Sequence, residues 1–217
     1  MKKIFVKQNI PNILLVSRII LTIAVVVLLL IPNSYFQTIY RLKSIITHND
    51  SYTVVTLNYL LAGIFFTVAS ITDFLDGHLA RKYNWVSDFG KLWDPIADKI
   101  LINSVLICLA AQNIIPVWIP VIMIARDVAV DADRMVAASK NVVVAANLYG
   151  KLKTIFQMVA IIFVFFFCNS SSTYEAAMYW GIQNLPMYIA CLLSLISGVI
   201  YFRDIHRTLK ERNAQQH

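Results

Sequence analysis

The stretch Ser70–Ile100 reads SITDFLDGHLARKYNWVSDFGKLWDPIADKI and holds five aspartates between segments that are almost wholly apolar. The chain of 217 residues is 59% hydrophobic and 14% charged, whereas about 25% of the residues of a soluble domain are charged. An aspartate near the centre of a bilayer costs about 2.5–3.5 kcal/mol on insertion scales. Several carboxylates in one short stretch therefore need compensating partners, and their spacing indicates which partners those are.

Long runs without a charged residue surround this stretch, and each has 21 residues or more. The runs are Ile19–Tyr40, Ser51–Thr72, Ile100–Ala125, Thr154–Tyr174 and Ala176–Phe202. About 20 residues of helix span a bilayer, and the runs lack the alternation of membrane β-strands. The sequence AQNIIPVWIP inside the third run predicts a turn, with Pro116 near the start of the next helix. The sequence thus predicts an all-α integral membrane protein.

We expect a single membrane domain over residues 1–217 with six transmembrane helices. The expected spans are roughly 10–32, 52–72, 95–112, 115–138, 152–170 and 185–205. The first residues, MKKIFVKQNI, predict a short amphipathic helix on the membrane surface.

Lysines and arginines gather on one side of these spans, and only Arg41 and Lys43 fall in the loops of the other side. The positive-inside rule therefore places both termini and the aspartate-rich stretch on the cytoplasmic side of the cell membrane. The net charge of +7 is interpreted as attraction to anionic membrane lipids, and we expect no nucleic-acid partner.

Four of the aspartates form two pairs with helical spacing. Asp73 and Asp76 are three residues apart, and Asp94 and Asp98 are four apart, so each pair shares one helix face. Two antiparallel helices joined by a turn around Tyr83–Gly90 present the pairs to each other. Two Mg²⁺ or Mn²⁺ ions, which prefer oxygen ligands, would relieve the repulsion and could clamp a phosphoryl group. The alternative is an ion-pair network with neighbouring lysines and arginines, which we favour for Asp88.

Eight residues of the stretch follow the pattern D-x2-D-G-x2-A-R-x8-G-x3-D-x3-D. They are Asp73, Asp76, Gly77, Ala80, Arg81, Gly90, Asp94 and Asp98. This pattern resembles the signature of the CDP-alcohol phosphatidyltransferases, with all fixed positions at the family's spacing. The resemblance implies six transmembrane helices, a dinuclear metal site on the cytoplasmic side, a homodimer, and transfer of a phosphatidyl group from a CDP-linked lipid to an alcohol with release of CMP.

The resemblance also implies roles for these residues. The metal ligands are Asp73, Asp76, Asp94 and Asp98. Asp98 is in addition the general base on the acceptor hydroxyl, which requires hydrogen-bond reach to that hydroxyl. The CDP-binding residues are Gly77, Ala80, Arg81 and Gly90. The small residues let a nucleotide lie against the helix, the arginine pairs with a phosphate or with the carboxylates, and Gly90 lets the turn close.

Further stretches resemble the bacterial phosphatidylglycerophosphate synthase branch of this family: NIPN with Arg18 six residues beyond it, ARDVAVDADR, GKLKT and SGVIYF. The implied donor is CDP-diacylglycerol and the implied acceptor is sn-glycerol 3-phosphate. The acceptor is a dianion, and the cations that we expect to bind its phosphate are Arg126, Arg134 and Lys151. Lys153 and Arg203 are expected to contact lipid headgroups or to set topology.

Some residues depart from the branch pattern. Leu15 stands where a threonine is common, Asp127 where glutamate is usual, and Asp131 and Asp133 where apolar or small residues are usual. The aspartates could neutralise the two arginines as ion pairs. They leave open another acceptor alcohol for the same chemistry, such as inositol phosphate, serine or phosphatidylglycerol. An aspartate-rich prenyltransferase and a divalent-cation transporter are alternatives of other classes, although no internal repeat of the transporter kind is visible.

Overall fold

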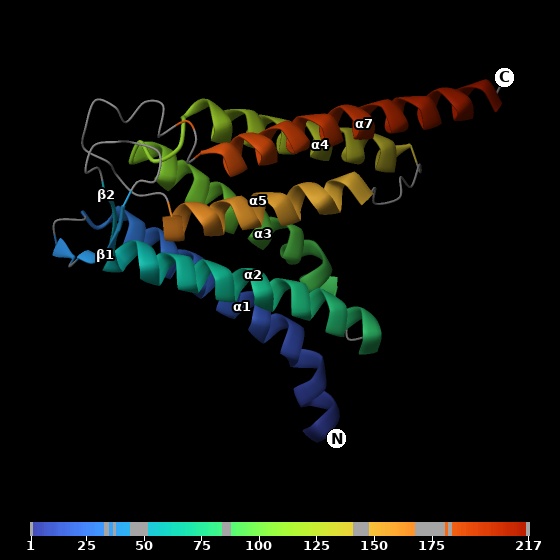
Figure 1. Cartoon of the computed structure of the whole chain (residues 1–217). Coiled ribbons are helices and arrows are strands. Elements are labelled where there is room, and N and C mark those ends of the chain that lie inside the picture. The colour runs from blue at the N-terminus through green and yellow to red at the C-terminus, as the bar shows by residue number, and fades with distance from the viewer. Residues whose placement is uncertain are drawn as a thin grey trace.

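The computed structural model shows a bundle of long helices (Figure 1) and describes residues 2–32, 35–36, 38–43, 52–83, 88–140, 148–167, 181 and 184–215. In parts of these ranges it describes the backbone alone. The helices in the described ranges are α1 (Lys2–Leu30), α2 (Leu57–Tyr83), α3 (Asp88–Ala111), α4 (Trp118–Ser139), α5 (Leu148–Phe167) and α7 (Leu185–Gln215). Strands β1 (Thr38–Lys43) and β2 (Tyr52–Thr56) form a small antiparallel sheet between α1 and α2.

The helices lie in three layers, with α4 and α7 on one side, α3 and α5 in the middle, and α1 and α2 on the other side (Figure 1). Helix α5 packs against both α2 and α7, while α1 packs against α2 and α3. Both chain ends, the end of α2 and the starts of α3 and α5 lie at one end of the bundle, and the β-hairpin lies at the opposite end. We call the first of these the termini end.

The structure agrees with the expected helical class and differs in three local features. MKKIFVKQNI is not a separate helix, because α1 runs without a break from Lys2 to Leu30. Pro11 lies inside α1, and an internal proline removes a backbone hydrogen bond and bends a helix, in agreement with the bend of α1 in Figure 1. Helices α2 and α3 also extend beyond their expected ends, so they include the whole aspartate pattern.

The third difference is strand β2, which occupies Tyr52–Thr56 where we expected the start of a helix. Its sequence YTVVT is rich in β-branched residues, which favour strands and disfavour helices. The expected turn after α3 is confirmed: α3 ends at Ala111, Asn113 has a positive φ of 58°, and α4 begins at Trp118.

Apolar side chains cover much of the outer surface of the helices. Val16, Ile20 and Ile23 on α1 and Leu192 and Val199 on α7 are exposed. Two segments are long and apolar enough to cross a membrane, Gly150–Phe167 in α5 and Leu185–Thr208 in α7, and shorter apolar segments occupy Leu15–Leu30 and Leu57–Asp73. Contiguous exposed apolar surface of this kind is rare in soluble monomers and suits contact with lipid.

The apolar core is tightest where α2 meets α5. Phe165 on α5 packs against Phe66 with ring centroids 5.9 Å apart, and against Tyr59 at 6.5 Å. Gly63 lies beside this ring, and a Cβ atom added there would be only 2.9 Å from Cβ of Phe165. The missing side chain therefore permits the close approach of the two helices, as is common for small residues between membrane helices.

We expect Gly63→Ala to lower the free energy of unfolding by about 1–3 kcal/mol, because the new methyl group overpacks the contact with Phe165. Thermal unfolding in detergent measures the change. Gly150→Ala is the matched control, since a Cβ there has nothing within 4 Å and helix propensity favours alanine. Equal stability of Gly63→Ala and the unaltered protein would contradict the tight contact.

Candidate active site

Two carboxylates of the aspartate pattern meet at one buried arginine. Asp73 on α2 accepts from Nη2 of Arg18 at 2.7 Å, and Asp98 on α3 accepts from Nη1 at 2.8 Å. The Arg18 side chain is 2% exposed, whereas those of Asp73 and Asp98 are 26% and 31% exposed. A single guanidinium thus links three helices and holds the two carboxylates near each other, with one part of each reaching solvent.

The other residues of the pattern lie outside the described side chains. Asp76, Gly77, Ala80 and Arg81 fall in α2, and Gly90 and Asp94 in α3, where only the helical backbone is described. Gly90 lies in the first turn of α3 and not in the turn between the helices. Among the residues whose side chains are described, no group of three or more His, Cys, Asp or Glu could hold a metal. The set of four aspartates stays a prediction.

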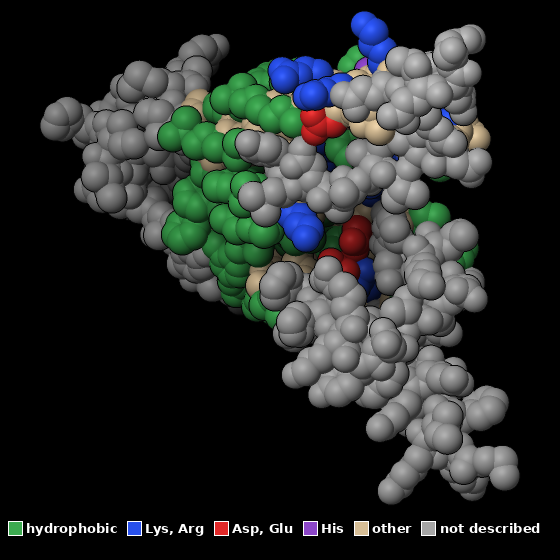
Figure 2. Space-filling model, turned by 90° about the vertical axis from the view of Figure 1, so that its right-hand side faces the viewer, with side chains coloured by type: hydrophobic (Ala, Val, Ile, Leu, Met, Phe, Trp, Pro, Cys, Tyr) green, Lys and Arg blue, Asp and Glu red, His purple; other side chains and the backbone are tan. Residues whose placement is uncertain are grey.

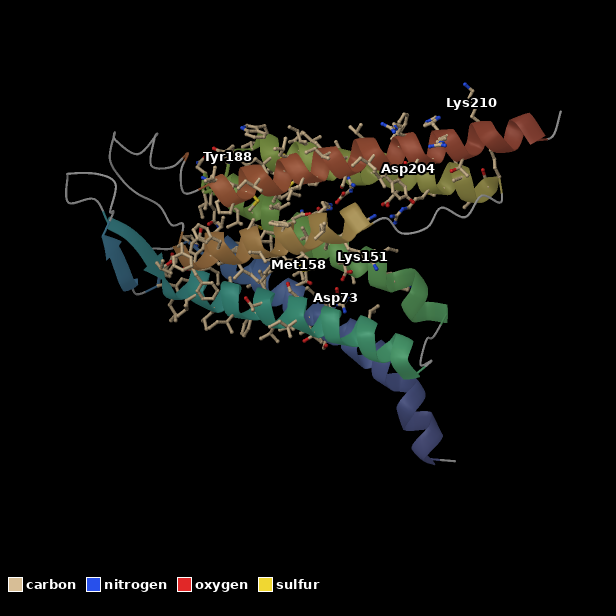
Figure 3. The ribbon with its side chains drawn as sticks, turned by 45° about the vertical axis from the view of Figure 1, so that its right-hand side comes forward. Asp73, Lys151, Met158, Tyr188, Asp204 and Lys210 are labelled. Carbon is tan, nitrogen blue, oxygen red and sulfur yellow. The ribbon has the colours of Figure 1, made fainter. Side chains whose placement is uncertain are left out.

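A cavity of about 580 Å³ opens beside Asp73 and Asp98 and is lined by residues of α2, α3, α4, α5 and α7. The three cations predicted for the acceptor phosphate, Arg126, Arg134 and Lys151, line the same cavity. Figure 2 shows acidic and basic side chains together in a hollow beside an apolar surface, and Figure 3 shows Asp73 and Lys151 facing the space between the helices.

The wall formed by α4, α5 and α7 contains a buried ionic cluster. Nζ of Lys153 lies 2.6 and 2.7 Å from the two carboxylate oxygens of Asp127, and Nη1 of Arg126 lies 2.8 Å from Asp127 Oδ1. Nη2 of Arg126 donates to Oγ of Ser197 at 2.6 Å. Asp127 thus pairs with Arg126, as the alternative in the sequence analysis held, but it also pairs with a lysine. Two cations share one carboxylate, so the cluster keeps a net positive charge.

Gly198 shapes this cluster, because a Cβ atom at that position would lie 2.9 Å from Nε of Arg126. The bare backbone of α7 therefore provides the surface on which the arginine side chain rests. The headgroup contact expected for Lys153 was wrong: the residue is 6% exposed and bound to Asp127, so it does not contact lipid headgroups. Arg203 is exposed on α7.

Arg134 is held by an aromatic ring. Its Nε donates to the hydroxyl of Tyr201 at 2.8 Å, and its guanidinium carbon lies 4.7 Å from the centre of that ring. Asp131 forms an ion pair with Lys99 of α3 instead of with an arginine. Asp133 is not among the residues that line the cavity. The two unusual aspartates thus leave the charge of Arg134 available on the cavity wall.

Residues 8–196 match the model of the family described as CDP-alcohol phosphatidyltransferase. The chain belongs to this family. The family predicted from the aspartate pattern is thereby confirmed, and the protein is a membrane enzyme of the phosphatidyltransferase class.

Similar proteins carry the name CDP-diacylglycerol–glycerol-3-phosphate 3-phosphatidyltransferase. The one from Mycoplasma genitalium is 42% identical over 164 residues, which cover 73% of this chain and 70% of the relative. The one from Mycoplasma pneumoniae is 35% identical over 216 residues, covering 94% and 90%. The one from Bacillus subtilis is 32% identical over 205 residues, covering 94% and 99%.

Sequence reasoning missed the roles of Arg18 and Lys153. Both are charged residues inside apolar helices, and this is the signal that could have identified them, because such residues usually face a partner or a wet cavity. Arg18 entered the sequence analysis only as the arginine six residues beyond NIPN. Lys153 lies two residues from Lys151, so the two side chains point to different faces of α5. Lys151 is exposed and Lys153 is buried.

We expect Asp127→Asn to lower the free energy of unfolding by about 3 kcal/mol, because removal of the shared carboxylate leaves two buried cations, Arg126 and Lys153, without a counter-charge. The double variant Asp127→Asn, Lys153→Met should recover at least half of this loss, since it removes one of the two uncompensated charges. Thermal unfolding in detergent measures both.

The matched control for the lysine substitution is Lys151→Met, which changes an exposed lysine on the same helix as Lys153 and should alter stability by less than about 0.5 kcal/mol. A double variant as unstable as Asp127→Asn alone would show that the loss does not come from uncompensated buried charge.

Proposed function

We propose that this protein transfers the phosphatidyl group of CDP-diacylglycerol to sn-glycerol 3-phosphate, giving phosphatidylglycerophosphate and CMP. One observation carries the proposal: the cavity that contains Asp73 and Asp98 also contains Arg126, Arg134 and Lys151. Acidic ligands for a cation and basic ligands for a phosphate thus face one space. The names of the similar proteins give the donor and the acceptor.

The acidic residues suit divalent cations. Carboxylate oxygens of Asp73 and Asp98 converge on one positive group, and such oxygens are the ligands that Mg²⁺ and Mn²⁺ prefer. We infer that Asp73, Asp76, Asp94 and Asp98 hold two ions. Bound there, the ions would neutralise charge on the diphosphate and on the leaving CMP. Gly77, Ala80, Arg81 and Gly90 would bind the CDP group in the adjoining part of α2 and α3.

The chain's own groups orient the acceptor. The guanidinium groups of Arg126 and Arg134 donate hydrogen bonds to the phosphate, and Lys151 adds a positive charge at the exposed edge of the cavity. Their geometry is fixed in advance, since Asp127 and Ser197 hold Arg126 and Tyr201 holds Arg134. Asp98 takes the proton of the acceptor hydroxyl, whose oxygen attacks the phosphorus that bears the diacylglycerol. The bond from that phosphorus to CMP breaks, and no covalent enzyme intermediate forms.

In the membrane we place six spans in a single domain over residues 1–217, with both termini and the cavity on the cytoplasmic side of the cell membrane. The position of the charged cavity toward the termini end supports placing the cavity and both termini on the same side of the membrane (Figure 3), and the positive-inside rule makes that side cytoplasmic. The donor's acyl chains would stay in the bilayer, and the chain would act as a homodimer.

The first test measures CMP release by the purified protein from CDP-diacylglycerol with Mg²⁺ or Mn²⁺, with and without sn-glycerol 3-phosphate. We expect release to require both the metal and the acceptor. Asp98→Asn should reduce the rate by about 10²–10⁴-fold, because it removes the general base and a charged ligand. Release only with serine, an inositol phosphate or phosphatidylglycerol would overturn the acceptor and leave the family chemistry intact.

A second test concerns Arg18, which neutralises the same carboxylates as the proposed ions. We expect Arg18→Gln to lower the melting temperature in EDTA, and added Mg²⁺ to raise it by more than in the unaltered protein, because ligands that bind the folded state stabilise it. Arg203→Gln, at an exposed arginine, is the control. A Mg²⁺ response equal to that of the unaltered protein would contradict the shared role.

A further inference from the structure

Two buried polar side chains in the cavity wall have no hydrogen-bond partner within the described part of the chain. Gln157 on α5 is 1% exposed, and neither its amide nitrogen nor its amide oxygen is paired. Ser70 on α2 is 7% exposed, and its Oγ is unpaired as well. Both residues line the cavity. Such unpaired groups cost about 1–3 kcal/mol each, and buried polar groups usually have partners. A ligand in the cavity could supply them.

Ser70 differs from the other hydroxyl residues near it. Thr67 donates its hydroxyl to the carbonyl of Gly63 at 2.6 Å, and Thr72 donates to that of Val68 at 2.7 Å. This bond to the preceding turn is the ordinary way in which a helix satisfies serine and threonine. Ser70 makes no such bond within the described structure, so its hydroxyl is not occupied by its own helix.

The two unpaired groups lie at the same depth. On α2, Ser70 lies three residues before Asp73 on the same helix face, one turn farther from the termini end. On α5, Gln157 lies four residues after Lys153 on the same face, again one turn farther from the termini end. Helices α2 and α5 run in opposite directions (Figure 1), and Gly63 contacts Phe165. Seven residues farther along α2 and seven residues back along α5, position 70 lies level with position 158, which is next to Gln157. Together Ser70 and Gln157 form an uncharged polar floor below the charged part of the cavity.

The chemistry of this floor fits one group of the acceptor. sn-Glycerol 3-phosphate carries a phosphate, a reacting hydroxyl and a second hydroxyl on its middle carbon. The cations of α4 and α5 match the phosphate, and Asp98 matches the reacting hydroxyl. An amide and a serine hydroxyl both donate and accept hydrogen bonds, and so does a secondary alcohol. The lipid donor fits less well, because its glycerol oxygens are esterified to chains in the bilayer, whereas Gln157 is almost closed off from the surface.

We propose that Gln157 and Ser70 bind the hydroxyl on the middle carbon of the acceptor and so select a glycerol phosphate over phosphates that lack this hydroxyl. The inference rests on the proposed function and extends it to acceptor specificity. A site built to hydrogen-bond a substrate hydroxyl discriminates strongly against the analogue without it, because its buried polar groups are then left unpaired.

The test compares two acceptors in the CMP-release assay with full-length protein, sn-glycerol 3-phosphate and 1,3-propanediol monophosphate, which lacks the middle hydroxyl. The unaltered protein should prefer the first by at least tenfold in kcat/KM. In Gln157→Leu, kcat/KM should fall tenfold or more with sn-glycerol 3-phosphate and stay unchanged with the analogue. Ser70→Ala should shift the ratio in the same direction by a smaller factor.

Ser194→Ala is the matched control, since Ser194 on α7 is also buried with an unpaired Oγ but does not line the cavity. It should leave the acceptor ratio unchanged. The melting temperature of Gln157→Leu should equal or exceed that of the unaltered protein, because the variant removes an unpaired buried amide.

Two outcomes would overturn the inference. An unchanged acceptor ratio in Gln157→Leu, with or without an equal loss of kcat/KM for both acceptors, would leave the proposed function standing and show that the amide serves the fold or a bound water. No CMP release by the unaltered protein with either acceptor would overturn the proposed function together with the inference.

Discussion

The contacts of Arg18 with Asp73 and Asp98 join α1, α2 and α3 at the point where charge enters an apolar bundle. Charges that leave water lose several kcal/mol of solvation each, and only close partners offset this loss. The guanidinium provides two nitrogens in one plane, so a carboxylate from each neighbouring helix can bind it at the same time. The packing of α1 against α2 and α3 thus fixes where the carboxylates lie, and the cavity forms beside them.

The opposite wall has the reverse arrangement of charge. Asp127 lies between two cations, Arg126 and Lys153, whereas Arg18 lies between two carboxylates. One side of the cavity therefore carries excess negative charge and attracts cations, and the other carries excess positive charge and attracts anions. The proposed transfer of a phosphatidyl group from a metal-bound diphosphate to an anionic acceptor would use both sides. The neutralising partners behind each wall let such opposed charges remain in a membrane protein.

The sequence predicts the parts of this structure that depend on periodicity and charge. Helical spacing placed Asp73 and Asp98 on separate helices, and the dipeptides around Pro116 located the turn between α3 and α4. Strand β2 was missed because the expected span was drawn from the length of the charge-free run, whereas the β-branched residues at its start favour a strand. The burial of Lys153 was missed because its partner Asp127 lies 26 residues away in sequence, and only the packing of α4 and α5 against α7 brings the two together.

The uncharged floor could not be predicted at all, because a glutamine and a serine inside apolar helices have no distinctive spacing. What marks Ser70 and Gln157 is a combination that only three dimensions reveal: burial, a cavity beside them and the lack of a protein partner among the described residues. Because Ser70 and Gln157 are buried away from outside water, only a polar group inside the cavity can supply their hydrogen bonds. An acceptor with the middle hydroxyl would pair these groups and bind more tightly, whereas an acceptor without it would leave them unpaired.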